Sequence, residues 1–260
     1  MLGADLALSA GRPSTASGTP PSGGGGALTN DYSLSLDGTD DYARLTGMTL
    51  SGAFTASFWF NPLSHAMANG DLFMTKGYDS TNVSVVTTET DWKLDYNAGG
   101  FRYSVFDRTQ AWATKIEATH TFSFSANTWH HIMITYDGGT STSGMGLFVD
   151  GVSKTLTSVT QNPSFTGNNS TSGTAVNVGR SPFGLSPLTG LVDEVAFWET
   201  DQSANISSIY TGTTPIDLSG LSTAPNDWFR FENNTDNSIP GGSGAASLVN
   251  GPTYSTSVPT

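Results

Sequence analysis

The sequence contains no cysteine, which excludes disulfide bonds, thiolate metal sites and cysteine nucleophiles together. Basic residues are also scarce, with 10 Lys and Arg against 22 Asp and Glu, and the formal net charge is -12. Binding to nucleic acid or to an anionic membrane surface depends on Lys and Arg, so we expect neither partner. Cations such as Ca²⁺, neutral sugars and other proteins are compatible with this charge.

Long apolar segments are missing as well. No run approaches the roughly 18 residues that a membrane span requires, so we expect no span. Residues 1–11 lack the basic start and the unbroken apolar stretch of a secretory signal peptide, because Asp5 interrupts them. We therefore expect that export of this protein does not use a classical secretory signal.

Turn-forming residues and aromatics are abundant, with 30 Gly, 12 Pro, 14 Phe, 8 Tyr and 6 Trp. From residue 30 onward, short segments of alternating apolar and polar residues are separated by turn signals, which is typical of β-strands. The pattern predicts an all-β fold of two stacked antiparallel sheets, with one short helix over residues 203–211. Period-two alternation predicts a core that includes Phe58, Phe60, Ile132, Ile134, Phe148, Val195 and Phe197.

The composition divides the chain into three segments. Residues 1–29 form a low-complexity arm, which lacks the apolar surface to fold alone and is either a flexible leader or a segment that orders against a neighbouring subunit. Residues 30–212 hold most of the expected strands and the helix. Residues 213–260 supply one more strong strand and a tail that packs on the sandwich or on a partner.

Several motifs follow one another in the order of a known family. They are 32–45 (YSLSLDGTDDYARL), 54–62 (FTASFWFNP), 129–151 with WHHIMITYD and GLFVDG, and 190–198 (GLVDEVAFW). Together they resemble the concanavalin A-like, laminin-G-like jelly-roll domains over residues 30–212. The resemblance implies a jelly-roll sandwich that binds ligands more often than it catalyses a reaction.

The C-terminal region has a narrower resemblance. The segments 213–218 (TTPIDL), 227–233 (DWFRFEN) and 247–258 (SLVNGPTYSTSV) are similar to the tails of jelly-roll proteins from marine bacteriophages. This resemblance implies a virion structural protein, a capsid decoration or a tail-fibre component, on the outside of a phage particle. Its partners would then be other virion proteins and further copies of itself as a homo-oligomer.

The acidic residues Asp37, Asp40 and Asp41 have two interpretations. Asp is favoured in tight turns for local hydrogen bonding, and carboxylates are also the ligands that Ca²⁺ prefers. The resemblance implies one structural Ca²⁺ held by Asp193 together with the turn formed by Asp37 and Gly38. Strict strand alternation would place Asp193 and its neighbour Glu194 on opposite faces, so that only one is a ligand.

Hydrolytic chemistry is not expected. Glu89 and Asp91 are two residues apart and would share a strand face, as a pair of glycosidase carboxylates requires. Jelly-roll glucanases use a third acid, however, and residues 93 and 94 are Lys and Leu here. His130 and His131 are adjacent in a strand and face opposite ways, so they cannot bind one metal together; we expect one to be packed and the other solvated.

Sugar binding would use aromatic side chains as stacking platforms. The candidates in turn-rich segments are Trp112, Trp92, Tyr78 and Tyr103. Most Trp side chains in such folds belong to the core, so each candidate has a structural alternative. The leading functional hypothesis is a non-enzymatic virion protein whose jelly-roll binds glycans or a host surface. The alternatives are an extracellular carbohydrate-binding or adhesion module of a marine bacterium and, third, a glycoside hydrolase.

Overall fold

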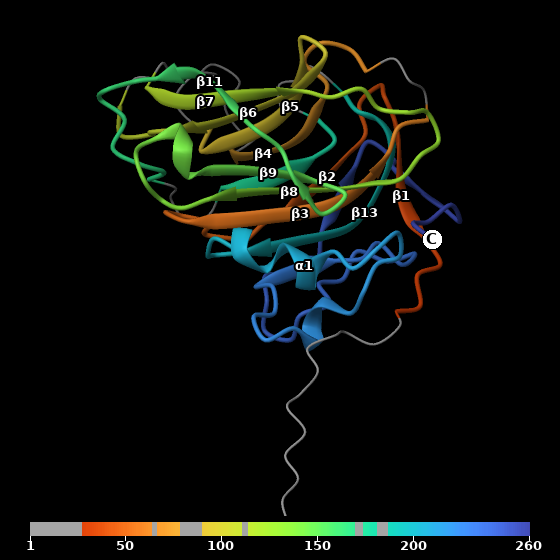
Figure 1. The fold of residues 1–260 in the computed structure, drawn as a ribbon. Helices are drawn as coiled ribbons and strands as arrows, with labels where there is room; N and C mark the ends of the chain where they lie inside the picture. The colour runs from red at the N-terminus through yellow and green to blue at the C-terminus, as the bar shows by residue number, and fades with distance from the viewer. Residues whose placement is uncertain (1–27, 64–66, 79–89, 111–113, 170–173, 181–186) are drawn as a thin grey trace, which may run out of the picture.

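The computed structural model of the chain describes residues 28–63, 67–78, 90–110, 114–169, 174–180 and 187–260. It contains two stacked antiparallel sheets, which confirms the expected all-β jelly-roll sandwich (Figure 1). The expectations for the N-terminal arm up to residue 27, for Glu89 and for Trp112 lie outside the described residues. No helix within the described ranges is long and apolar enough to cross a membrane.

The first sheet has eight strands, and β14 pairs with β13 beside the main path. In spatial order the strands are β10 (Val152–Ser153), β9 (Met145–Val149), β8 (His130–Tyr136), β3 (Phe54–Asn61), β13 (Thr189–Trp198), β1 (Ser33–Asp37) and β16 (Thr253–Ser255), with β14 (Asp227–Phe229) on β13.

The second sheet also has eight strands, and it forms the upper layer in Figure 1. In spatial order they are β11 (Thr157–Gln161), β7 (Lys115–Thr121), β6 (Gly100–Phe106), β5 (Trp92–Asn97), β4 (Leu72–Tyr78), β12 (Ala175–Val178), β2 (Tyr42–Leu45) and β15 (Ser247–Val249). The helical turns are η1 (Thr142–Gly144), η2 (Ser203–Asn205), α1 (Ile206–Ile209) and η3 (Leu218–Gly220). The turns η2 and α1 together confirm the single short helix expected at residues 203–211.

The space between the sheets is filled by one large apolar cluster. Alternation along the strands directs every second side chain into it, as predicted. Six of the seven predicted core residues lie there, and Phe148 does not. Its neighbours Leu147 and Val149 face this core, so Phe148 points to the opposite face of the first sheet.

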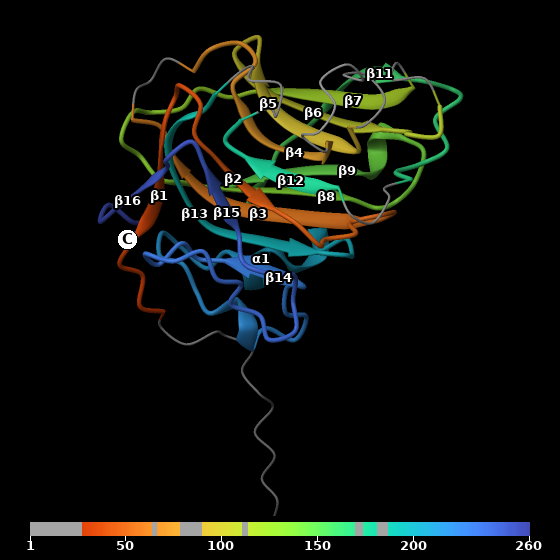
Figure 2. The same cartoon turned by 180° about the vertical axis from the view of Figure 1, so that it is seen from behind.

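A second apolar cluster covers that opposite face. Phe148, Trp198 and Trp228 belong to it, together with Ile209 of α1 and Leu218 of η3. Phe148 and Trp198 come from strands of the first sheet itself, and the segment that contains α1 lies below that sheet, on the side away from the second sheet (Figures 1 and 2). The first sheet is therefore buried on both faces, which explains why aromatic residues occur at both parities of its strands.

Residues 213–260 are part of the sandwich. The strands β14, β15 and β16 pair with β13, β2 and β1 respectively, so the tail contributes to both sheets. Figure 2 shows β15 and β16 beside β2 and β1, where the end of the chain returns to its beginning.

Candidate functional site

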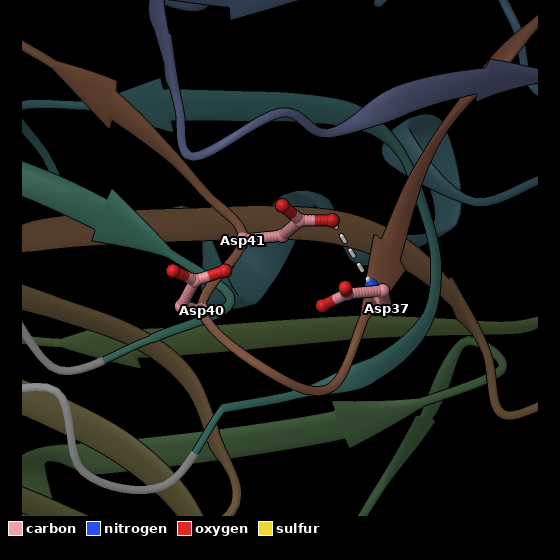
Figure 3. A group of neighbouring side chains, drawn as sticks. All are labelled: Asp37, Asp40 and Asp41. Carbon is pink, nitrogen blue, oxygen red and sulfur yellow. Dashed lines mark hydrogen bonds between the residues drawn. The ribbon is translucent and has the colours of Figure 1, made fainter.

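An acidic loop joins β1 to β2 at one end of the sandwich. Asp37 ends β1, and Asp40 and Asp41 precede β2. One carboxylate oxygen from each of the three residues lies within 4.8 Å of the others. Figure 3 shows the three carboxylates around the mouth of the loop, with Asp37 on one strand and the other two at the start of the next. Carboxylate oxygens at this separation can share one cation of the Ca²⁺ type, which takes about six to eight oxygen ligands.

Local hydrogen bonds fix the shape of this loop. The Thr39 backbone N–H donates to the Asp37 Oδ1 at 2.7 Å, and the Asp37 backbone N–H donates to the Asp41 Oδ2 at 3.2 Å (Figure 3). Gly38 has a φ of 77°, and a Cβ at this position would lie 1.8 Å from the Thr189 Oγ1 of β13. Only glycine therefore allows the turn to lie this close to β13.

Two side chains from distant segments hold the loop from outside. The Arg180 guanidinium donates to the Asp40 carbonyl oxygen at 2.9 Å, and the Asn250 Nδ2 donates to the same oxygen at 2.9 Å. Arg180 follows β12, and Asn250 lies in the turn between β15 and β16. The loop is thus anchored by the C-terminal tail as well as by the jelly-roll.

The electrostatics of the loop favour a cation. Burial raises the pKa of Asp41, and the charges of Asp37 and Asp40 raise it further, against the opposing hydrogen bond from the Asp37 N–H. Asp41 is 5% exposed, whereas Asp37 is exposed and Asp40 is partly exposed. A bound cation would remove the repulsion among the three carboxylates, and Asp37 and Asp40 remain accessible to it.

The expected pairing of Asp193 with the Asp37–Gly38 turn is not formed. In the β1–β13 ladder Asp37 lies opposite Thr189, and Leu34 lies opposite Val192. Asp193 is therefore four residues further along β13, a displacement of roughly 13 Å at the usual rise of a strand. The carboxylates that lie near Asp37 are those of Asp40 and Asp41, and not that of Asp193.

The expectation that Asp193 and Glu194 face opposite ways is wrong, because β13 contains a β-bulge at these residues. The register of β13 against β3 shifts between Asp193 and Ala196, and Glu194 has a φ of 52°. Val192 and Val195 both face the main core, so the inserted residue leaves Asp193 and Glu194 on the same side.

The two bulge carboxyl groups are tied to neighbouring segments. Asn30 Nδ2 donates to Asp193 Oδ2 at 2.9 Å, and Arg230 Nε donates to Glu194 Oε1 at 3.1 Å. Burial, followed by the charge of Glu194, raises the pKa of Asp193 well above its usual range. Burial also raises the pKa of Glu194, to about 8, against the opposing charge of Arg230.

Two of the aromatic residues proposed to stack on sugars lie in the core. Trp92 is fully buried and stacks on Phe54 with ring centroids 5.0 Å apart. Tyr103 is also fully buried, and its hydroxyl donates to the Thr135 carbonyl oxygen at 3.3 Å. Neither is accessible to a sugar. Tyr78 ends β4, but its side chain is outside the described part of the chain, as is all of Trp112.

A surface hollow of about 470 Å³ lies at the other end of β1, where the first described residues meet the C-terminal tail. It contains one partly exposed aromatic ring, that of Tyr32, beside the exposed carboxylate of Asp31. Ring faces and carboxylate acceptors are the groups that hold sugars in many sites. The residues that line it are Asn30, Asp31, Tyr32, Thr256 and Val258. Sequence patterns gave no signal for this hollow, because it forms between segments more than 200 residues apart.

The carboxylate of Asp91 is not placed for catalysis. It is fully buried, it accepts from Lys76 Nζ at 2.9 Å, and it pairs with Arg108 at 3.2 Å. Burial lowers the pKa of Lys76, and the charge of Asp91 opposes this shift. A carboxylate neutralised by two cations in a closed core has no access to a glycosidic bond.

A serine and a histidine come close together, but they lack the rest of a catalytic triad. Ser57 Oγ and His131 Nε2 are 2.7 Å apart, and each residue is 2% exposed. Burial lowers the pKa of His131 to about 4, and its Nδ1 has no hydrogen-bond partner among the described residues. His130 faces the other way and is partly exposed, and its ring packs on Phe122 and pairs with Asp150 at 2.8 Å.

Comparison with known families agrees with this architecture. The family model described as the concanavalin A-like lectin/glucanases superfamily, in its laminin-G form, matches residues 37–205. The matched segment is more than half of the chain, and the chain therefore belongs to this superfamily. No curated protein sequence matches it.

Two solved structures share the fold. A heptameric SAP-like pentraxin from Limulus polyphemus has a TM-score of 0.54 and 10% identity, over 88% of this chain and 96% of the pentraxin. A Bacteroides ovatus protein assigned a carbohydrate-binding role has a TM-score of 0.57 and 15% identity, over 88% of this chain and 60% of that protein. At these identities the likeness extends to the fold alone.

Proposed function

We propose that this protein is a non-enzymatic binding module that takes up a divalent cation at the Asp37–Asp40–Asp41 loop and binds glycans or a glycan-bearing surface. The observation that carries the proposal is the convergence of three carboxylates within 4.8 Å at an accessible loop. The net charge of -12 favours a cation and a neutral ligand over an anionic one.

The burial of the candidate acid–base groups among the described residues, Asp193 and Glu194 included, supports a binding role over a hydrolytic one. Asp91 is neutralised by Lys76 and Arg108, and the Ser57–His131 pair is closed to solvent. The membership of a superfamily that includes lectins, and the fold shared with a carbohydrate-binding protein, support the same conclusion.

A glycan array probed with and without Ca²⁺ tests the proposal. We expect binding to a subset of glycans that chelator abolishes, and that Asp40→Asn also abolishes because it removes one ligand oxygen without disturbing a side-chain hydrogen bond of the loop. The matched control is Asp236→Asn, which removes the same charge from an exposed position elsewhere. A third variant, Tyr32→Ala, locates the sugar: lost binding with cation uptake retained would place it in the hollow.

Binding unaffected by chelator and by Asp40→Asn would contradict the role of the loop. Turnover of any bound glycan would contradict the non-enzymatic role.

The narrower proposal is a location on the exterior of a phage particle, as a capsid decoration or tail-fibre component. It rests on the similarity of the segments 213–218, 227–233 and 247–258 to the tails of marine phage jelly-roll proteins. Mass spectrometry of purified virions tests it, and absence of the chain from particles would leave an extracellular adhesion module as the alternative.

A further inference from the structure

The turn between β15 and β16 contains one of the two Asn-Gly dipeptides of the chain. It is Asn250-Gly251, and the other is Asn69-Gly70. Asparagine is a chemically labile residue, and a following glycine has no Cβ to shield its backbone nitrogen from the asparagine side chain. Both dipeptides are therefore chemically suited to spontaneous deamidation, and the structure around each decides whether the reaction occurs.

The backbone after Asn250 is open to this reaction. Residues 250 and 251 are exposed, and the Gly251 N–H donates no hydrogen bond within the part of the chain that the structure describes. The two flanking strands do not pair with each other, because β15 pairs with β2 in the second sheet and β16 pairs with β1 in the first (Figure 2). The turn therefore lacks the ladder of hydrogen bonds that fixes the backbone of an Asn-Gly hairpin.

The backbone after Asn69 is closed to the same reaction. The Gly70 N–H donates to the Tyr96 carbonyl oxygen at 2.7 Å, so the attacking nitrogen is already engaged. The Asn69 Oδ1 accepts from the Ala98 N–H at 2.8 Å, which holds the side-chain amide in place. The two dipeptides share one chemistry and differ in their surroundings, so Asn69 is an internal reference for Asn250.

The side chain of Asn250 connects the C-terminal tail to the acidic loop. Its Nδ2 donates to the Asp40 carbonyl oxygen at 2.9 Å, and the Arg180 guanidinium donates to the same oxygen at 2.9 Å. Within the described residues this is the hydrogen bond that the Asn250 side chain makes. The atom that makes the contact, Nδ2, is the atom that deamidation removes.

We propose that Asn250 is a site of spontaneous deamidation, and that its conversion releases the acidic loop from the C-terminal tail. Hydroxide removes the proton of the Gly251 N–H, and the nitrogen attacks Asn250 Cγ. A C–N bond forms, the Cγ–Nδ2 bond breaks, and ammonia leaves a cyclic succinimide behind. Water then opens the ring at either carbonyl carbon to give aspartate or isoaspartate, and the new acid loses its proton to the ammonia. The net reaction consumes one water and releases one ammonium ion.

Both products remove the contact between the tail and the loop. A carboxylate cannot donate to the Asp40 carbonyl oxygen, and its charge adds to the three carboxylates already gathered in the loop. Isoaspartate also lengthens the backbone between β15 and β16 by one methylene group. Arg180 is then the described side chain that still holds the Asp40 carbonyl oxygen. None of these steps needs a bound cation, so the proposal can be tested apart from the proposed binding function.

Peptide mass spectrometry of the folded full-length protein, incubated at mildly alkaline pH, tests the modification. We expect residue 250 to become a mixture of aspartate and isoaspartate while Asn69 remains an amide. In urea both asparagines should convert at similar rates, because each is followed by glycine and the structural difference is gone. If residue 250 stays an amide in the folded protein, over a period in which it converts in urea, the proposal is overturned.

Hydrogen exchange of the loop amides at residues 37–41, measured without Ca²⁺, tests the release of the loop. Asn250→Asp supplies one product directly, and Asn250→Gly removes the donor without adding charge, at a φ of 67° that glycine adopts freely. Both variants should exchange faster than the wild type in the loop, and Asn250→Asp more than Asn250→Gly because it also adds charge. The matched control Asn127→Asp adds the same charge at an exposed residue with a φ of 57° and should exchange like the wild type. Unchanged exchange in Asn250→Asp would overturn the release of the loop.

Discussion

At the scale of single residues, Asp107 shows how one buried carboxylate joins two loops. Its oxygens accept hydrogen bonds from Thr109, Thr166 and Asn169, at distances between 2.6 and 3.1 Å. Burial raises the pKa of Asp107, but these hydrogen bonds outweigh burial and bring the pKa down to about 2. The ionised carboxylate therefore ties the segment after β6 to the segment after β11.

Replacing Asp107 with Asn should reduce the free energy of unfolding by about 2 kcal/mol at neutral pH, since one pKa unit corresponds to about 1.4 kcal/mol. A carboxylate whose pKa is lowered by folding stabilises the native state above its unfolded pKa, and this contribution is lost as pH falls toward 2. Urea unfolding of both proteins from pH 7 to pH 2 should show the difference shrinking to near zero. A difference that stays constant over this range would show that the charge of Asp107 is not its source.

The sequence predicted individual residues well where strand alternation was unambiguous. Phe54, Phe58 and Phe60 are separated by even numbers of residues, and all three lie in the main core although Trp59 interrupts the alternation. Phe148 is flanked by Leu147 and Val149, so its run is apolar throughout and its face could not be deduced. Trp92 was expected in a turn, but it is the first residue of β5. The expectation failed because the residues just before this strand are rich in turn-forming types.

At the scale of elements, the bulge in β13 is the feature that the sequence concealed. An inserted residue changes the face of every side chain after it, and nothing in the motif VDEV marks Glu194 as the extra one. The covered outer face of the first sheet was equally hidden, because it depends on residues 200–246 folding back onto that sheet. The positions of the strands along the chain and the turn at Gly38, by contrast, could be predicted because each depends on a short local motif.

The carboxyl group of Glu194 in the bulge should make the stability of the folded protein depend on pH. Burial raises the pKa of Glu194 to about 8, so the folded protein binds a proton that the unfolded chain releases above about pH 4.5. Stability from this group is therefore complete below pH 4.5 and is lost as pH rises toward 8. Glu194→Gln should remove this part of the decline in thermal unfolding experiments between pH 5 and pH 8.

The control for that experiment is Glu199→Gln, which changes an exposed glutamate just after the same strand and should keep the wild-type decline. An identical pH profile in wild type and Glu194→Gln would mean that the carboxyl group of Glu194 is already ionised at neutral pH in the folded state.

At the scale of the whole molecule, the chain is a jelly-roll in which the last 48 residues, 213–260, add strands to both sheets. The same segment donates a hydrogen bond to the acidic loop. Asn250 reaches Asp40 from the tail, so the candidate cation site and the C-terminal segment form one unit.

The most direct test of the central claim is calorimetric titration of the metal-free chain with Ca²⁺. The wild type should bind one ion per chain, and Asp236→Asn should bind with the same affinity. Asp40→Asn should bind at least tenfold more weakly, which corresponds to about 1.4 kcal/mol. Ca²⁺ at about 100 times the dissociation constant should then stabilise the wild type by about 2.7 kcal/mol. No heat of binding in the wild type, or equal binding by Asp40→Asn, would contradict the assignment of the acidic loop as the site of this binding module.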